Sequence, residues 1–296
     1  MFPTKLLIFL ILPLFNTGVK VEKGLFDFLF SPCKCRCGLP NREARFKGGE
    51  YLRGHEFPWL SAIQVLGEGD EEGSTIPGTL INNKYVVTAA SQLDGITPYQ
   101  IKVTLGQFDK CNNDISSTNV SVDKIIMHPD FSSENKANDI ALIKLSTPVL
   151  IERRVSPICL SVPGHSYLGQ VATIAGWPKS EEEGAEEGQT TCRPKKIGLP
   201  VLSSQECIET AADTDSYTRD KGCVGVVGAP SVVCDDDGGN AVMYRSHRGI
   251  YELIGIMTDQ NACEDDSTNT ALYTRVNDHL AWIVQNTRDA CYCIKT

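Results

Sequence analysis

The sequence is short of the features that mark membrane proteins and nucleic-acid-binding proteins. Beyond residues 6–15, no stretch approaches the roughly 18 consecutive apolar residues that a membrane helix needs. Basic residues are outnumbered, with 28 Lys and Arg against 37 Asp and Glu, and the formal net charge is −9. We therefore expect neither a membrane nor nucleic acid as a partner. The chain also shows no internal repeat of fixed period.

The first residues predict export. Lys5 precedes the apolar run at residues 6–15, and small or polar residues follow it, which is typical of a secretory signal peptide over residues 1–18. Twelve cysteines in an exported chain favour disulfides over metal sites. We therefore expect a secreted, extracellular protein with no metal and no cofactor. The acidic runs lack the spaced ligands and turn glycine of a calcium loop.

Most of the chain is predicted to form short strands. Segments rich in Val, Ile, Leu and Tyr alternate with turns that contain Gly, Asn, Asp or Pro. The segments are WLSAIQVL, GTLINNKYVVTAA, IKVTLGQF, DIALIKL, QVATIAGW, IGLPVL, MYRSHRGIYELIGIM and ALYTRV. Only residues 276–287 have helical spacing, with Leu280, Ile283 and Val284 on one face. The pattern predicts a mainly β fold that ends in one α-helix.

Six segments resemble, in the same order, those of the chymotrypsin/trypsin-like serine peptidase family, between Arg45 and Thr287. They are EFPWLSAIQV, YVVTAA, NDIALIKL, ATIAGW, CDDDGGN and ALYTRVNDHLAWI. The resemblance implies two six-stranded antiparallel β-barrels with an active-site cleft between them and a C-terminal α-helix. It divides the chain into a cysteine-containing leader at residues 19–45 (propeptide or light chain), a peptidase domain at 46–290 and a cysteine-containing tail at 291–296.

The catalytic positions that this resemblance implies hold the wrong residues for catalysis. The family's histidine follows TAA, where this chain has Ser91, and its serine precedes paired glycines, where this chain has Asp237. Only Asp139, in NDIAL, matches its family role. A hydroxyl cannot act as a general base near neutral pH, and Asp237 is a carboxylate with no imidazole to serve. We therefore predict that the protein is not an enzyme and is a serine-type endopeptidase by fold only.

Other parts of the family's machinery are altered as well. Asp235 aligns best with the glycine whose amide begins the oxyanion hole, and its charge would oppose the developing oxyanion. Val232 stands at the position of the acid in a trypsin-type specificity pocket. The family's substrate-pairing strand carries Ser-Trp-Gly, and this chain reads Thr258, Asp259 and Gln260 there. The resemblance thus implies no trypsin-like specificity.

The activation site implied by the resemblance is recognisable but changed. The family reads Arg followed by Ile-Val-Gly-Gly, and this chain reads Arg45, Phe46, Lys47 and then two glycines. We predict cleavage between Arg45 and Phe46. Asp236 aligns with the acid that binds the new amino terminus in active relatives. Lys47, however, brings a charge to a place where a valine is normally buried, so cleavage need not order the activation pocket.

The cysteines follow the family with one paired loss. Gln92 and Ile76 occupy both positions of the family disulfide beside the histidine, and this paired loss avoids an orphan thiol. By resemblance, the pairs are Cys207–Cys223, Cys234–Cys263 and Cys159 with one leader cysteine, the last as in arthropod-type zymogens. The remaining pairings stay open among Cys33, Cys35, Cys37, Cys111, Cys192, Cys291 and Cys293.

These substitutions predict a secreted, catalytically inactive serine protease homologue of arthropod type that acts by binding protein. The partner would be a protease, zymogen or inhibitor of a proteolytic cascade, or a prey or microbial target if the protein is a venom or immune component. Two alternatives stay open: a protease with residual or unconventional activity, and a component with no specific ligand. Asn119, in an Asn-Val-Ser sequon, predicts glycosylation in a surface loop.

Overall fold

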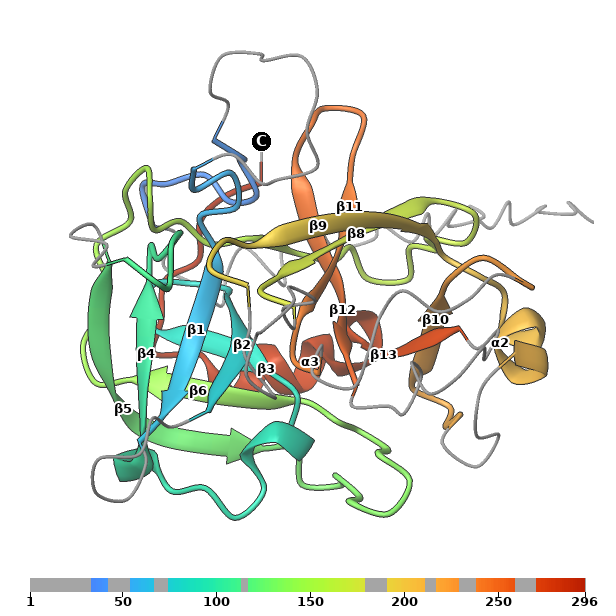
Figure 1. Cartoon of the computed structure of the whole chain (residues 1–296), viewed down its shortest axis with the longest axis horizontal. Helices are drawn as coiled ribbons and strands as arrows, with labels where there is room; N and C mark the ends of the chain where they lie inside the picture. Colours follow the sequence, from blue (N-terminus) through green and yellow to red (C-terminus); the bar gives the residue numbers. More distant parts are fainter. Residues whose placement is uncertain are drawn as a thin grey trace, which may run out of the picture.

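Two β-sheets, one from each half of the chain, form the body of the molecule (Figure 1). The computed structural model describes residues 33–41, 54–66, 74–112, 117–178, 191–210, 217–228, 238–258 and 270–295. Among these residues, no helix has the length and apolar character needed to cross a membrane. The predicted fold, two six-stranded antiparallel barrels followed by a C-terminal helix, is confirmed.

The first sheet closes on itself as a six-stranded barrel. Its strands are β1 (Leu60–Val65), β2 (Thr75–Leu80), β3 (Tyr85–Thr88), β4 (Ile101–Leu105), β5 (Thr118–Met127) and β6 (Ala141–Leu145). They pair antiparallel in the order β1-β2-β3-β6-β5-β4, and β4 pairs again with β1. Branched apolar side chains such as Ile63, Val103 and Leu142 are fully buried and fill its interior. These are the residues that pack best on a pleated surface, which explains why the segments form strands.

The second sheet is built from the chain after residue 158. Its strands are β7 (Cys159–Leu160), β8 (Val171–Gly176), β9 (Lys195–Pro200), β10 (Lys221–Val224), β11 (Ala241–Arg245), β12 (Tyr251–Met257) and β13 (Ala271–Arg275). Six of them pair in the order β10-β13-β12-β11-β8-β9, and β7 runs parallel to β12. An antiparallel bridge between Val201 and Val224 joins the two outer strands, β9 and β10, and completes the barrel.

The C-terminal helix forms as predicted. Helix α3 (Val276–Asn286) buries Leu280 and Ile283 in the main apolar core, and Val284 on the same face is half-buried. An amphipathic helix of this kind is stabilised mainly by its packed face. The short helices η1 (Ser91–Leu93) and η2 (Pro98–Gln100) connect β3 to β4.

The longest elements that escaped the sequence prediction are one helix and two strands. Helix α2 (Ser204–Thr210) starts after a capping box in which Ser203 and Glu206 exchange hydrogen bonds, and the Ser-x-x-Glu spacing was its only signal. Strands β5 and β10 were missed because both begin with polar residues. The prediction that Asn119 lies in a loop was therefore wrong. Asn119 is exposed on β5, and its Oδ1 accepts a hydrogen bond from Thr104 Oγ1 at 2.6 Å.

Three disulfides hold the leader to the second barrel and to the end of the chain. They are Cys37–Cys159, Cys33–Cys291 and Cys35–Cys293. Between them, Arg36 and Ile294 form a parallel β-bridge. Gly38 has a φ of +68°, and a Cβ at this position would lie 2.2 Å from the carbonyl oxygen of Tyr251. Glycine thus lets the leader approach β12 closely enough for Tyr251 N to donate to Gly38 O at 2.8 Å.

The remaining described disulfides are Cys111–Cys192 and Cys207–Cys223. The Cys207–Cys223 pair and the link from Cys159 to the leader are pairs that the family resemblance implies. Cys111–Cys192 and the two bonds to the tail are among the pairings that the sequence left open. The pair Cys234–Cys263 lies outside the described residues and stays a prediction.

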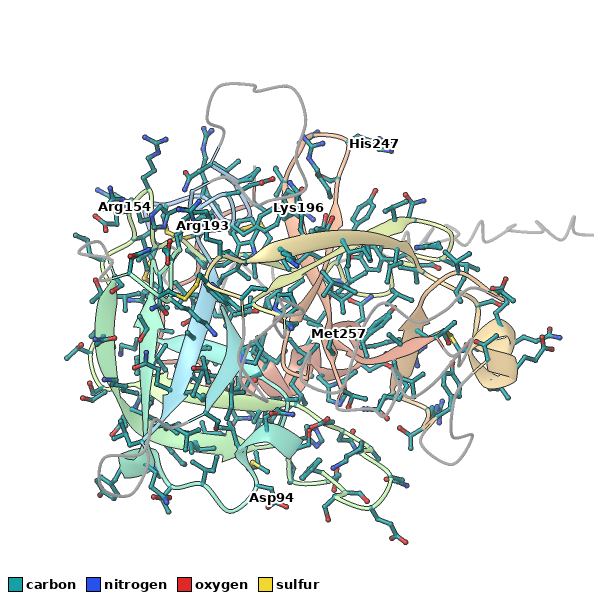
Figure 2. The ribbon with its side chains drawn as sticks, viewed as in Figure 1. Asp94, Arg154, Arg193, Lys196, His247 and Met257 are labelled. Atoms are coloured by element: carbon teal, nitrogen blue, oxygen red, sulfur yellow. A yellow bond between two sulfur atoms is a disulfide. The ribbon has the colours of Figure 1, made fainter. Side chains whose placement is uncertain are left out.

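The two barrels also meet along the edge of β9. Lys196 Nζ pairs with Glu56 Oε1 at 2.6 Å, and Arg193 Nε pairs with Asp109 Oδ2 at 3.1 Å. Figure 2 shows Arg193 and Lys196 where β9 lies over the first barrel. The Cys111–Cys192 disulfide joins the same two parts of the chain. The halves are therefore connected covalently on this side, next to two ion pairs.

Candidate active-site cleft

The fold brings Ser91 and Asp139 together. Ser91 begins η1, three residues after β3, and Asp139 lies two residues before β6. Strands β3 and β6 pair antiparallel with Thr88 opposite Ala141, so the residues that follow β3 and precede β6 meet at the same end of the barrel. The Ser91 backbone N–H donates to Asp139 Oδ1 at 2.7 Å, and Ser91 Oγ donates to Asp139 Oδ2 at 2.9 Å. Asp139 is fully buried.

A third group of the cleft reaches the same carboxylate from the second barrel. Thr258 follows β12, is almost fully buried, and donates its hydroxyl to Asp139 Oδ2. The sequence placed Thr258 on the substrate-pairing strand, and the structure shows its side chain turned toward Asp139. Asp139 thus receives hydrogen bonds from one amide and two hydroxyls, so both of its carboxylate oxygens have partners.

A buried lysine lies behind Thr258. Lys221 is the first residue of β10 and has no exposed surface. Its Nζ donates to Thr258 Oγ1 at 3.1 Å and to Thr274 Oγ1 at 2.7 Å. Burial lowers the pKa of Lys221 to about 8, although the charges of Asp139 and Asp220 act in the opposite sense. Sequence reasoning missed this residue, because a lysine at a strand end is normally expected at the surface.

Part of the loop that carries the nucleophile position is held against β3. Gly239 has a φ of +91°, and a Cβ there would lie 2.5 Å from Thr88 Oγ1 and 2.7 Å from Pro77 O. Its N–H donates to Met257 O at 2.8 Å. The second of the paired glycines therefore packs against the strand that leads to Ser91, and only glycine fits this backbone conformation and spacing.

Several predicted site residues lie outside the described part of the chain. They are the cleavage-site residues Arg45 and Phe46, and Val232, Asp235, Asp236, Asp237, Asp259 and Gln260 of the cleft. Their assignments remain predictions. The structure thus describes Ser91, Asp139 and Thr258 of the predicted cleft residues and brings these three together.

The histidines are engaged away from Asp139. His279 bonds to Arg275 O at 2.9 Å and to Asn138 Oδ1 at 3.1 Å, and the ring of His128 meets it edge-on with 5.1 Å between centroids. His165 lies against Tyr167, and His55 faces Phe108. None of these contacts directs an imidazole nitrogen to the carboxylate of Asp139. None of these four histidines is therefore placed as the base that Asp139 would orient.

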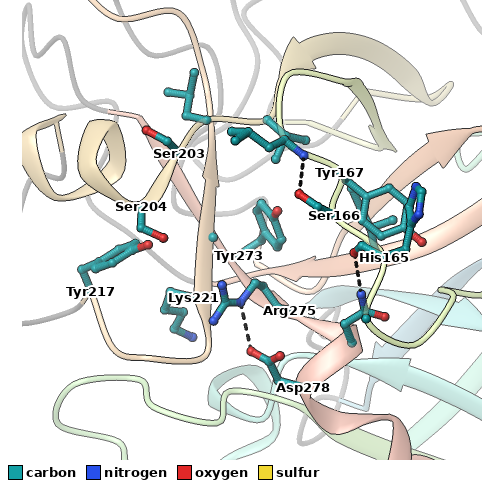
Figure 3. Close-up of a pocket in the computed structure, with 17 residues that line it drawn as sticks. His165, Ser166, Tyr167, Ser203, Ser204, Tyr217, Lys221, Tyr273, Arg275 and Asp278 are labelled. Carbon is teal, nitrogen blue, oxygen red and sulfur yellow. Dashed lines mark hydrogen bonds and ion pairs between the residues drawn. The ribbon is translucent and has the colours of Figure 1, made fainter.

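A cavity of about 400 Å³ lies in the second barrel and has Lys221 among its lining residues (Figure 3). Its walls come from the loop at residues 164–168, the start of α2 and the start of α3. Two of its charged residues, Arg275 and Asp278, pair with each other at 2.9 Å between Nε and Oδ2. This ion pair adds no net charge to the cavity. It does not resemble a catalytic dyad.

One cluster has the donor types of a metal site but not the chemistry. Asp109, Cys111 and Cys192 bring a carboxylate and two sulfurs within 4.8 Å of one another. The two sulfurs are bonded to each other as a disulfide, and a disulfide sulfur is not the thiolate that binds metal. This group therefore offers no metal site while the disulfide is intact.

Comparisons with known proteins place this geometry in context. The model of the trypsin family matches residues 46–283. Phenoloxidase-activating factor 3 of Holotrichia diomphalia is 29% identical over 276 residues, which cover 87% of this chain and 76% of the relative. Serine protease 7 of Drosophila melanogaster is 26% identical over 296 residues, covering 92% of this chain and 72% of that protein.

A vertebrate protein is similar to the chain as well. Vitamin K-dependent protein C of Mus musculus is 27% identical over 248 residues, which cover 81% of this chain. The match spans 51% of that relative, so the chain covers about half of its length.

Proposed function

The chain belongs to the trypsin family of serine proteases, and we propose that it is a secreted member that has lost catalysis and acts by binding other proteins. The single observation that carries the proposal is the pairing of Ser91 with Asp139, 2.9 Å between Ser91 Oγ and Asp139 Oδ2. A serine hydroxyl thus stands at the position of the histidine that takes the nucleophile's proton in the catalytic triad.

The chemistry of the family explains why this substitution abolishes turnover. Acyl transfer needs a nucleophile, a base that takes and returns its proton, and an acid that orients the base. Ser91 cannot accept a proton near neutral pH, and the sequence has Asp237 at the nucleophile position. In a serine protease that carries the same triad on an unrelated fold, losing the nucleophile or the base alone lowers turnover by roughly 10⁶.

The disulfides support secretion. The described residues carry five disulfides and no free cysteine. Disulfides of this number persist in oxidising compartments outside the cell. Together with the predicted signal peptide at residues 1–18, they support export of the chain.

We propose a regulator or cofactor of a proteolytic cascade as the biological role. The names of two relatives, phenoloxidase-activating factor 3 and phenoloxidase-activating factor 1 of Holotrichia diomphalia, describe factors that act on an enzyme's activation. A protease, zymogen or inhibitor is the matching class of partner. The acidic runs at residues 67–73 and 181–187, both outside the described residues, favour a basic partner surface and faster association at low salt.

Hydrolysis assays test the loss of catalysis. The full chain, both intact and cut after Arg45, is incubated with a broad peptide library and with an active-site phosphonate. We expect neither turnover nor labelling, while an active trypsin-family protease prepared alongside shows both. The double variant Ser91→His, Asp237→Ser serves as the matched control for recovery of the chemistry. Turnover by the wild-type chain, with contaminating proteases excluded, would mean that residual or unconventional proteolysis is its function.

Capture from native fluid tests the binding role. The immobilised chain is exposed to the fluid at low salt and then washed at high salt, and the retained proteins are identified. We expect a protease, zymogen or inhibitor with a basic surface, released as salt screens the attraction. A variant with Gln in place of the glutamates of residues 181–187 should retain less of it. If nothing is retained at low salt, the cascade role loses its support.

A further inference from the structure

We propose that Lys221, acting through the hydroxyl of Thr258, supplies the positive charge that balances the buried Asp139, so that this carboxylate links the two barrels instead of orienting a base. The inference rests on the proposed function in one respect, because an Asp139 that still served a catalytic base could not have this role. It adds a function for a residue that lies outside the family's catalytic positions.

The hydrogen bonds among Lys221, Thr258 and Asp139 form a chain in which each donor points toward Asp139. Lys221 Nζ donates to Thr258 Oγ1 at 3.1 Å, and the Thr258 hydroxyl donates in turn to Asp139 Oδ2. A single hydroxyl therefore accepts from the cation and donates to the anion. Ser91 donates to the same carboxylate oxygen from the first barrel at 2.9 Å. Such chains polarise each of their members, which strengthens the bonds in a buried setting.

The burial of the lysine calls for an opposite charge. Lys221 and Asp139 have no exposed surface, and an isolated buried charge costs far more than a paired one. The charges of Asp139 and Asp220 raise the pKa of Lys221, while burial, the largest influence, and Lys136 lower it. The resulting pKa of about 8 leaves the amine protonated at neutral pH. Asp139 and Lys221 thus compensate each other across Thr258.

Asp220, next to Lys221, makes a second link to the segment that carries Asp139. Asp220 Oδ2 accepts a hydrogen bond from the Asn138 N–H at 2.9 Å. Although burial opposes it, the charge of Lys221 helps to hold the pKa of Asp220 below its ordinary value. Two consecutive residues of the second barrel therefore hold two consecutive residues that lead into β6 of the first barrel. This arrangement is a fixed joint between the barrels.

This joint would also oppose catalysis if a histidine were restored at position 91. A cation beyond Thr258 would disfavour the imidazolium that a histidine at position 91 must form during acyl transfer. Restoring the histidine alone would therefore place a weaker base beside Asp139. Lys221 is a positioning residue, since it acts on Asp139 through Thr258.

A double-mutant cycle tests the coupling. Melting temperatures are measured for the wild-type full chain, Lys221→Met, Asp139→Asn and the double variant, with Lys124→Met on exposed β5 as the matched control. We expect the double variant to lose at least about 3 °C less than the sum of the two single losses. Lys124→Met combined with Asp139→Asn should be additive within about 1 °C. Additivity of the Lys221 and Asp139 losses within the same range would overturn the proposal.

A second measurement remains informative if Lys221→Met does not fold. In Ser91→His, the pKa of the new imidazole is followed by NMR. We expect it to be lower than in the double variant Ser91→His, Lys221→Gln, because the charge of Lys221 opposes the formation of an imidazolium beside Asp139. An unchanged imidazole pKa between the two variants would show that Lys221 does not act on Asp139 and would overturn the proposal. Neither measurement detects hydrolysis, so turnover by the wild-type chain would contradict the proposed function without changing these readouts.

Discussion

The two barrels share a fold but differ in what stabilises them. Among the described residues, the first half has an interior of buried apolar side chains, and its one fully buried acid, Asp139, lies at the cleft. The described part of the second half buries two charged residues, Lys221 and Glu252, each with polar partners. Glu252 pairs with Lys295 of the tail at 2.7 Å and accepts a hydrogen bond from Tyr167 at 2.9 Å. Within these described residues, the second half thus buries charge of both signs and the first half buries one acid.

The cysteines show the same asymmetry. Between residues 38 and 158 the sequence has one cysteine, Cys111, and it bonds to Cys192 in the other half. The first barrel consequently closes without an internal disulfide, because Ile76 and Gln92 stand at the positions of the family's pair. Cys207–Cys223 lies within the second half, and three further bonds attach the leader to Cys159 and to the tail. Core packing and the hydrogen bonds between its strands therefore hold the first barrel together without a disulfide inside it.

Removing core volume from the first barrel should have the largest effect. Leu142 on β6 is fully buried, so Leu142→Ala leaves a cavity and is expected to cost about 2–5 kcal/mol of unfolding free energy. Denaturant titration measures this loss. Leu150→Ala is the matched control because 80% of the Leu150 side chain is exposed, and it should cost less than about 0.5 kcal/mol. Similar losses for both variants would contradict the dependence of this barrel on packing.

Raising the pH should stabilise the second barrel through Lys221. Its pKa is about 8 in the folded protein, against 10.5 for an ordinary lysine side chain, so the unfolded chain binds more protons between these values. Stability then rises with pH over this window, by about 3 kcal/mol at most. The groups that act on Lys221 are Asp139, Asp220 and Lys136.

The measurement is the difference in unfolding free energy between wild type and Lys221→Met from pH 7 to pH 10.5. Taking the difference removes the contribution of Lys110, whose pKa burial also lowers to about 8. A difference that stays flat across this range would show that Lys221 carries no buried charge at neutral pH.

The leader disulfides provide a test of the cysteine pairing in the second half of the molecule. We expect a chain cut after Arg45 to run as one species without reductant and as two with it, since three disulfides bridge the cut. The double variant Cys37→Ser, Cys159→Ser should keep the leader attached through the bonds of Cys33 and Cys35 to the tail. Its unfolding free energy should fall by about 2–4 kcal/mol. Release of the leader from this variant on a non-reducing gel would contradict the pairing.

Much of the fold could be predicted from local sequence. The strands that were found consist of apolar runs bounded by turn residues, and α3 has a clear helical period. Strand β5 begins with polar residues and was missed, although its alternation of exposed residues with buried ones such as Val120 and Val122 is itself a strand signal. Helix α2 is seven residues long, too short for a periodic pattern. The meeting of Ser91 with Asp139 followed from the family resemblance, since no local pattern joins residues 48 positions apart.

The sequence by itself determined which residues stand at the positions that the family resemblance assigns to catalysis. A serine follows TAA and an aspartate precedes the paired glycines, and the proposed loss of catalysis rests on them because side-chain chemistry is a property of the residue. Only the tertiary structure decided where charge is buried and which cysteines meet. Lys221 lies behind Thr258, and Cys33 bonds to a cysteine 258 residues away. Such contacts depend on how distant strands pack, and neither burial nor pairing is encoded in the neighbouring residues.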